Sequence, residues 1–166
     1  MTIAHKESVW PIDVLKDLVN GNLDQEVLMA MQQAPKEPGR FNAVLEIEQA
    51  KVPWEDKILV PVGEGLYIVE NERGRVVKHK CGHEFGSYKN NWKLSALIYE
   101  RDTTEKLQEL YPGPRACNPD WNVLREFICP TCGSMLETEA VPPGYPITFN
   151  FLPDENALDA ISKGTY

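Results

Sequence analysis

The residues best suited to chemistry in this sequence are two short groups of cysteine and histidine, far apart in the chain. The first reads His79-Lys-Cys81-Gly-His83 and the second reads Cys129-Pro-Thr-Cys132-Gly. Two cysteines separated by two residues can bind one tetrahedral ion, and a glycine after the second one lets the backbone turn back. Each group also follows a stretch with the composition of a β-strand. Together they are typical of the two knuckles of a zinc ribbon separated by a long insertion.

This interpretation supplies three metal ligands directly, which are Cys81, Cys129 and Cys132. A histidine would be the fourth. In common zinc ribbons the residue after Cys-Gly is not a ligand, whereas one before the second cysteine is, and this favours His79. The compact Cys81-Gly-His83 spacing also permits His83, so both histidines remain candidates. We therefore expect one structural zinc ion per chain.

Two other interpretations of the cysteines are weaker. A lone Cys-x-x-Cys with an internal proline can be a redox pair. A redox pair does not need a second Cys-Gly group elsewhere in the chain, but this sequence contains a second one at Cys81-Gly82. An iron site of the rubredoxin type needs four cysteines, but Cys117 lies too far from either group to be an obvious fourth ligand. We expect Cys117 to have a packing role.

Signatures of catalysis are missing from the sequence. A catalytic zinc site keeps one position open and places a general base beside it. His83-Glu84 is not followed by the second histidine of HExxH, and the zinc deaminase pattern also fails. Dinucleotide, Walker and Gly-x-Ser-x-Gly motifs are absent as well. Asp102, Glu105 and Glu126 would be catalytic only beside a pocket, so we expect a closed structural site and no catalytic residues.

The elements that must position these groups begin with three short helices. Pro11 can open the first helix and Gly21 can end it. Asp24 is a good N-cap for the second helix, and the third is expected over residues 39–50. Isolated helices of this length are marginal in water, so they must pack on their own domain or on a partner.

Segments rich in β-branched and aromatic residues follow these helices, and we expect strands at 57–62, 66–70, 75–78, 96–100 and 123–128. A short helix is expected over 103–110 and another over 154–161. Eight of the 13 prolines lie in residues 112–153, and the sequence Pro143-Gly-Tyr-Pro146 excludes a central strand or a helix interior at that point. The expected fold class is α+β, with short N-terminal helices, a small antiparallel β-domain bearing a zinc-ribbon-like site, and an extended proline-rich tail. The corresponding domains are 1–52, 53–141 and 142–166.

Composition excludes several classes of protein. The 166 residues carry 25 acidic and 17 basic side chains, a formal charge of −8, which argues against a surface that follows nucleic-acid phosphates. Apolar runs are too short to span a bilayer, so no membrane partner is expected. The first residues lack the apolar core of a signal peptide. We therefore expect a cytoplasmic protein, in a compartment where cysteines bind metals more often than they form disulfides.

Four motifs in this order carry a family resemblance: Trp54-Glu-Asp-Lys-Ile58, Cys81-Gly-His-Glu-Phe85, Asn91-Trp-Lys-Leu-Ser95 and Arg125-Glu-Phe-Ile-Cys-Pro-Thr-Cys-Gly133. The set resembles the gamma subunit of acetone carboxylase and its acetophenone carboxylase relatives. The resemblance runs from Leu15 to Pro153. In that family the first knuckle often reads Cys-x-Cys-Gly-His, and here His79 takes the place of the first cysteine. A His-for-Cys exchange preserves metal binding and supports His79 as a ligand.

The resemblance implies a small, zinc-bearing and noncatalytic subunit of an ATP-dependent ketone carboxylase, which converts ketone, bicarbonate and ATP to a β-keto acid. It also implies a hetero-oligomer with large, hydantoinase-like alpha and beta subunits that hold ATP and a divalent metal. The gamma subunit would brace these subunits, and Trp54, Trp92 and Trp121 are candidates for contacts with them. A stand-alone zinc-ribbon adaptor for an unrelated protein is the alternative.

Overall fold

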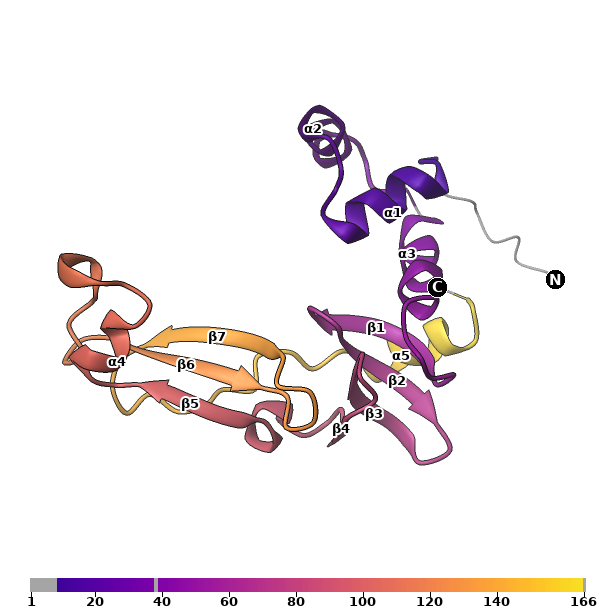
Figure 1. Ribbon diagram of the computed structural model, residues 1–166. Coiled ribbons are helices and arrows are strands. Elements are labelled where there is room, and N and C mark those ends of the chain that lie inside the picture. Colours follow the sequence, from indigo (N-terminus) through magenta and orange to yellow (C-terminus); the bar gives the residue numbers. More distant parts are fainter. Residues whose placement is uncertain (1–8, 38, 166) are drawn as a thin grey trace.

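The computed structural model describes residues 9–37 and 39–165. The N-terminal stretch that lacks a signal-peptide core lies outside these residues, as does Pro38. Figure 1 shows a group of helices at one end, a four-stranded sheet beside it and a three-stranded sheet at the far end. The fold is α+β, as predicted, with short helices followed by antiparallel strands.

Three short helices form the N-terminal part, and they are α1 (Ile12–Asn20), α2 (Gln25–Gln33) and α3 (Gly39–Gln49). Helix α1 ends at Gly21, whose φ of 72° is left-handed and therefore suits glycine. The side chain of Asp24 caps α2 by accepting a hydrogen bond from the Glu26 amide at 2.8 Å. Leu15, Met31 and Ile47 form a small core between the helices. The predicted helices and caps are confirmed.

The first sheet contains β1 (Lys57–Gly63), β2 (Leu66–Asn71), β3 (Gly74–His79) and β4 (Glu84–Ser87) in chain order, all antiparallel. One face buries Tyr67 and Val69 against Leu45 of α3. The other face carries Ile68 and Val77 into the main core. Because both faces are covered, β1 and β2 carry apolar runs with little polar alternation. Strand β4 was not predicted, since it is short and contains Gly86.

The second sheet contains β5 (Leu97–Arg101), β6 (Val123–Ile128) and β7 (Met135–Val141), with β6 in the centre. The 3-10 helix η1 (Trp92–Ser95) precedes it, while α4 (Thr104–Gln108) and the 3-10 helix η2 (Gly113–Arg115) lie between β5 and β6. A chain of edge-to-face aromatic contacts links the two sheets. The ring centroids of Phe85 in β4 and Trp92 are 5.7 Å apart, and those of Trp92 and Phe127 in β6 are 6.1 Å apart. The two sheets therefore share one core.

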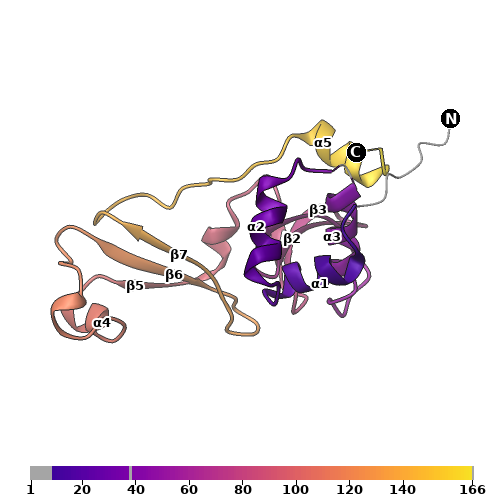
Figure 2. The ribbon, with the colours of Figure 1, turned by 90° about the horizontal axis from the view of Figure 1, so that it is seen from above.

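Residues 145–154 contain neither helix nor strand and lead to α5 (Glu155–Ser162). In Figure 2 this segment returns from the second sheet to the end of the molecule that holds the helices. Helix α5 is anchored there by an ion pair of 2.5 Å between Asp159 and Arg75. Its Leu158 is buried in the main core. The division of the chain into three domains stays a prediction.

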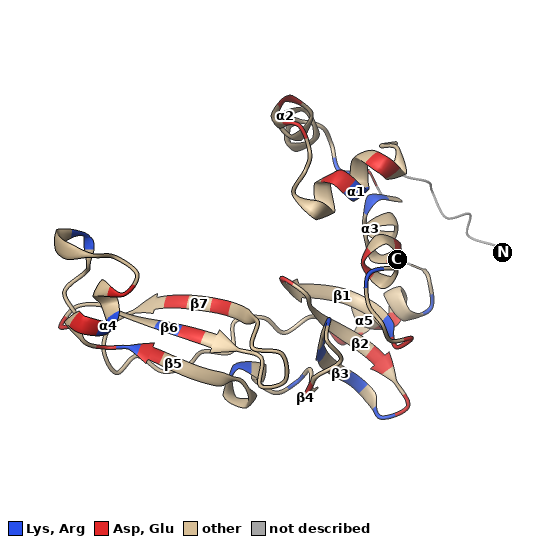
Figure 3. Cartoon of the chain, in the orientation of Figure 1, with Lys and Arg blue, Asp and Glu red and all other residues tan. Residues whose placement is uncertain are grey.

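Charged residues of both signs lie on the two sheets (Figure 3). Several of the basic side chains form ion pairs with acidic side chains of the same chain. Lys93 is fully buried and contacts Glu137 at 2.6 Å and also Glu139. Burial opposes the charge on Lys93, but the hydrogen bonds to both glutamates outweigh it and raise its pKa. Within the described part of the chain, no helix is long and apolar enough to cross a membrane.

Candidate metal centre

The first knuckle is the tight turn between β3 and β4. The amide of His79 donates to the His83 carbonyl at 2.9 Å, and the amide of Gly82 donates to the His79 carbonyl at 2.8 Å. Gly82 has a φ of 95°, a conformation that side chains with a Cβ rarely adopt. This turn brings the His79 ring and the Cys81 thiol to the same side.

The second knuckle, between β6 and β7, has the same design with one more residue. The amide of Cys129 donates to the Ser134 carbonyl at 2.9 Å, and the amide of Gly133 donates to the Cys129 carbonyl at 3.0 Å. Gly133 also has a left-handed φ, of 72°. By these hydrogen bonds His79 occupies the place in the first knuckle that Cys129 occupies in the second.

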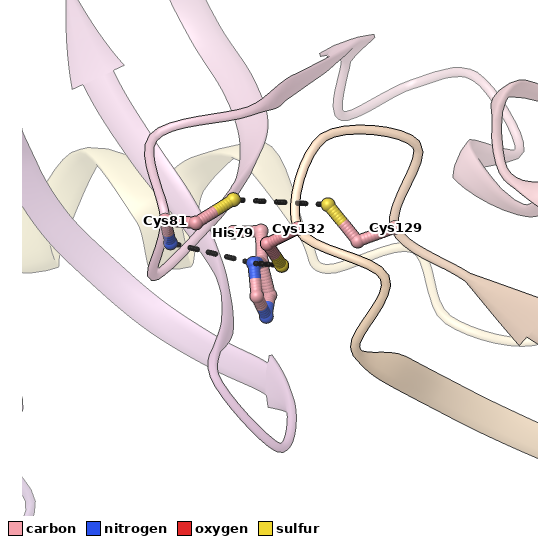
Figure 4. A group of neighbouring side chains, drawn as sticks. All are labelled: His79, Cys81, Cys129 and Cys132. Atoms are coloured by element: carbon pink, nitrogen blue, oxygen red, sulfur yellow. Dashed lines mark hydrogen bonds between the residues drawn. The ribbon is translucent and has the colours of Figure 1, made fainter.

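The junction of the two sheets brings four side chains together, as Figure 4 shows. The ligand atoms of His79, Cys81, Cys129 and Cys132 all lie within 4.8 Å of one another. The sulfurs of Cys81 and Cys129 are 3.7 Å apart, and His79 Nδ1 lies 3.6 Å from the Cys132 sulfur.

These spacings fit the edges of a tetrahedral site. Bonds of about 2.3 Å to sulfur and about 2.0 Å to nitrogen place two sulfurs about 3.8 Å apart and a sulfur and a nitrogen about 3.5 Å apart. Three thiols and one imidazole also match the soft donors that zinc prefers. The four side chains could therefore hold one metal ion with no open position.

The four candidate ligands do not share one electrostatic environment, and the pKa values of three of them shift for different reasons. Burial lowers the pKa of His79, so its ring is neutral and able to bind a metal at pH 7. Burial raises the pKa of Cys81 to about 11, whereas hydrogen bonds from Ser134 lower the pKa of Cys132 to about 7. A divalent cation at the centre would stabilise all the thiolates, because cysteine binds metals in that form.

Comparison with known proteins decides the family. A family model described as the acetone carboxylase gamma subunit matches residues 52–162. The chain is 44% identical over 140 residues to the acetone carboxylase gamma subunit of Xanthobacter autotrophicus, which covers 83% of each chain. This chain belongs to the acetone carboxylase gamma subunit family. The resemblance read from the four sequence motifs is thus confirmed.

A second relative is more distant. The acetophenone carboxylase beta subunit of Aromatoleum aromaticum is 37% identical over 89 residues, which is 52% of this chain and 69% of that one. The region that matches the acetone carboxylase gamma family contains both knuckles and both sheets. A gamma subunit is one part of a larger enzyme, so membership of this family implies partner subunits.

The structure separates the two candidate histidines. His83 lies outside the four-residue group, and its Nδ1 is 2.8 Å from Thr131 Oγ1 in the second knuckle. Its ring also meets Phe85 edge-on, with centroids 4.6 Å apart. Cys117 is likewise outside the group and lies half-buried beside the Asn122 side chain.

The three tryptophans proposed for partner contacts have different surroundings. Trp92 is a core residue with 8% exposure, so in this fold it is not available to a partner. The indole N–H of Trp54 donates to the Lys80 carbonyl at 3.2 Å, and this contact supports the first knuckle. Trp121 is 79% exposed and is the best placed of the three for an interface.

Three residues near the site were missed by sequence reasoning, namely Trp54 in its supporting role, Thr131 and Ser134. The Ser134 hydroxyl lies 3.2 Å from the Cys132 sulfur. Serine directly after Cys-Gly was a visible signal, since knuckle sulfurs commonly accept hydrogen bonds from nearby donors. The part played by Trp54 had no local signal, because it depends on a contact between residues far apart in the sequence.

Proposed function

We propose that this chain is a zinc-binding, noncatalytic subunit that braces the large subunits of an ATP-dependent ketone carboxylase. Family membership supports the carboxylase part of this proposal. The single observation that supports the structural role of the metal is the closed set of His79, Cys81, Cys129 and Cys132 at the junction of two sheets. A catalytic zinc would need a coordination position left for water or substrate.

Zinc at this site would act as a cross-link. It would join β3 and β6, and so fix how the two sheets are oriented. The chain's own residues would hold the ion and orient it, with Ser134 holding the Cys132 thiolate through a hydrogen bond. A subunit with a fixed angle between its sheets can present a rigid surface to a large partner.

The chemistry would take place on the partners. In this proposal the large, hydantoinase-like alpha and beta subunits bind ATP and a divalent metal, and they convert ketone and bicarbonate to a β-keto acid in the cytoplasm. The N-terminal helices and the segment after residue 141 would contact them. This assignment rests on the family and on the lack of catalytic motifs in the sequence.

The test is reconstitution with and without this chain. We expect the lone protein to contain one zinc ion and to carboxylate no ketone. We expect the large subunits to assemble poorly or lose carboxylation when this chain is omitted, and to recover both when it is added back. Carboxylation by the lone chain, or full activity of the large subunits without it, would contradict the proposal. Stable binding to an unrelated protein and not to these subunits would favour the adaptor alternative.

A further inference from the structure

One contact joins the two knuckles without using any of the four candidate ligands. His83 Nδ1 and Thr131 Oγ1 share a hydrogen bond of 2.8 Å. His83 follows Cys81-Gly82 in the turn between β3 and β4, and Thr131 lies between Cys129 and Cys132 in the turn between β6 and β7. The bond therefore connects the same two turns that the metal ion would connect.

Both partners of this bond are held in place on their own side. The carbonyl of His83 accepts from the His79 amide at 2.9 Å, which fixes its backbone to a candidate ligand. Its ring is held by the buried Phe85, whose centroid is 4.6 Å away. The backbone of Thr131 lies inside a closed turn, because the Gly133 amide donates to the Cys129 carbonyl at 3.0 Å.

We propose that His83 and Thr131 are positioning residues that hold the two knuckles together around the metal. A site whose halves are already aligned loses less conformational freedom when it binds an ion, and it reopens less readily. The bond would slow release of the metal because the knuckles must separate before the ion is free. This inference rests on the proposed zinc site, and it gives His83 a role other than ligand.

The experiment measures the rate at which the full-length zinc protein gives up its metal to an excess of a chromogenic chelator. The variants are His83→Ala, Thr131→Val, the double variant and the conservative Thr131→Ser, which keeps a hydroxyl. Thr138→Val is the matched control, since Thr138 lies in β7 of the second sheet and its hydroxyl donates a hydrogen bond to the Met135 sulfur, outside both knuckles. Cobalt-substituted samples report by absorption whether the ligand set is unchanged.

We expect His83→Ala and Thr131→Val to release zinc about tenfold faster, as is typical when a residue that supports metal ligands is lost. The double variant should be no faster than the single ones, because both remove the same bond. Thr131→Ser and Thr138→Val should keep the wild-type rate. All variants should keep the cobalt spectrum of three thiolates and one imidazole.

Four results would overturn the inference. Wild-type release rates in both single variants would show that the bond does not hold the site. Additive effects in the double variant would show that the two residues act separately. Loss of the cobalt spectrum in His83→Ala would make His83 a ligand. A wild-type protein that takes up no metal would defeat the proposed zinc site itself, and the inference with it, so the two failures are distinguishable.

Discussion

The two sheets of this protein differ in how they are covered. The first is packed on both faces, by α3 on one side and by the shared core with Leu158 of α5 on the other. The second shares that core, but its edge strand β5 leaves Leu97, Ile98 and Tyr99 exposed by 56%, 41% and 37%. The first sheet is therefore covered on both faces, whereas the second depends on the shared core and on the junction where the cysteines meet.

This difference leads to an expectation about stability. Apolar burial is the main favourable contribution to folding, so the sheet with the smaller covered area should open first. The metal centre lies at the junction and takes two of its candidate ligands, Cys129 and Cys132, from the second sheet. Perturbing the centre should consequently affect the second sheet more than the first.

The largest effect is expected for Cys129→Ser. Cys129 is fully buried in the main core as well as being a candidate ligand, so the variant loses both the ion and a packed sulfur. We expect the free energy of unfolding to fall by about 4 kcal/mol or more, as for other losses of a structural metal. Calorimetry and hydrogen exchange measure this, and amides of β6 and β7 should exchange first.

Cys117→Ser is the matched control for that variant, since Cys117 lies outside the four-residue group. It should keep the metal and the melting temperature. An equal loss in both cysteine variants would argue against a metal-dependent junction.

The next largest effect is expected for Lys93→Met. The fully buried ammonium lies between Glu137 and Glu139, and removing it leaves two carboxylates facing each other without a cation. Breaking such a buried group costs about 3 kcal/mol. Thermal unfolding measures this loss. Lys89→Met removes an exposed pair with Glu155 and should have little effect, so equal losses would disprove the special role of the buried cation.

A smaller, pH-dependent effect is expected at the first sheet. The hydrogen bond from Arg75 holds the pKa of Asp159 below its usual range. A lowered carboxyl pKa stabilises the fold above the ordinary value of about 3.9, and this stability disappears as pH falls through the folded-state pKa. Asp159→Asn should thus melt slightly below wild type from pH 5 to 8. The two curves should converge as the pH falls through the lowered folded-state pKa of Asp159, and a constant gap at all pH values would exclude this ion pair as the cause.

The smallest effect on stability is expected for Trp121→Ala. This side chain is 79% exposed, so its loss should change the free energy of unfolding by less than about 0.5 kcal/mol. Binding to the large subunits should nevertheless weaken, because exposed tryptophans are common anchors of interfaces. Isothermal titration with the large subunits measures this. Unchanged affinity would remove Trp121 from the interface.

Much of the fold was predictable because local signals marked it. Gly21, with its positive φ, ends α1, and the side chain of Asp24 caps the start of α2. Both signals are visible in the local sequence. The apolar strands of the first sheet were equally clear. Strand β7 was not predicted, since Glu137 and Glu139 interrupt its pattern. Their partner Lys93 is distant in sequence, so the reason for two acids in a strand is visible only in three dimensions.

The candidate site was predictable in composition but not in geometry. Cys-Gly spacing identified both knuckles, and the choice between His79 and His83 was left open. The structure places His79 Nδ1 beside the Cys132 sulfur and His83 Nδ1 beside the Thr131 hydroxyl. That choice depends on how two distant turns face each other, which spacing alone does not encode.

The most direct test of the account is X-ray absorption at the zinc edge of the purified chain, together with metal analysis. The account predicts one zinc ion per chain, with three sulfur neighbours at about 2.3 Å and one nitrogen neighbour at about 2.0 Å. It also predicts the same spectrum in His83→Ala and a different one in His79→Ala. A chain without metal, or a zinc ion with a water ligand and an incomplete set of thiolates, would contradict a closed structural centre.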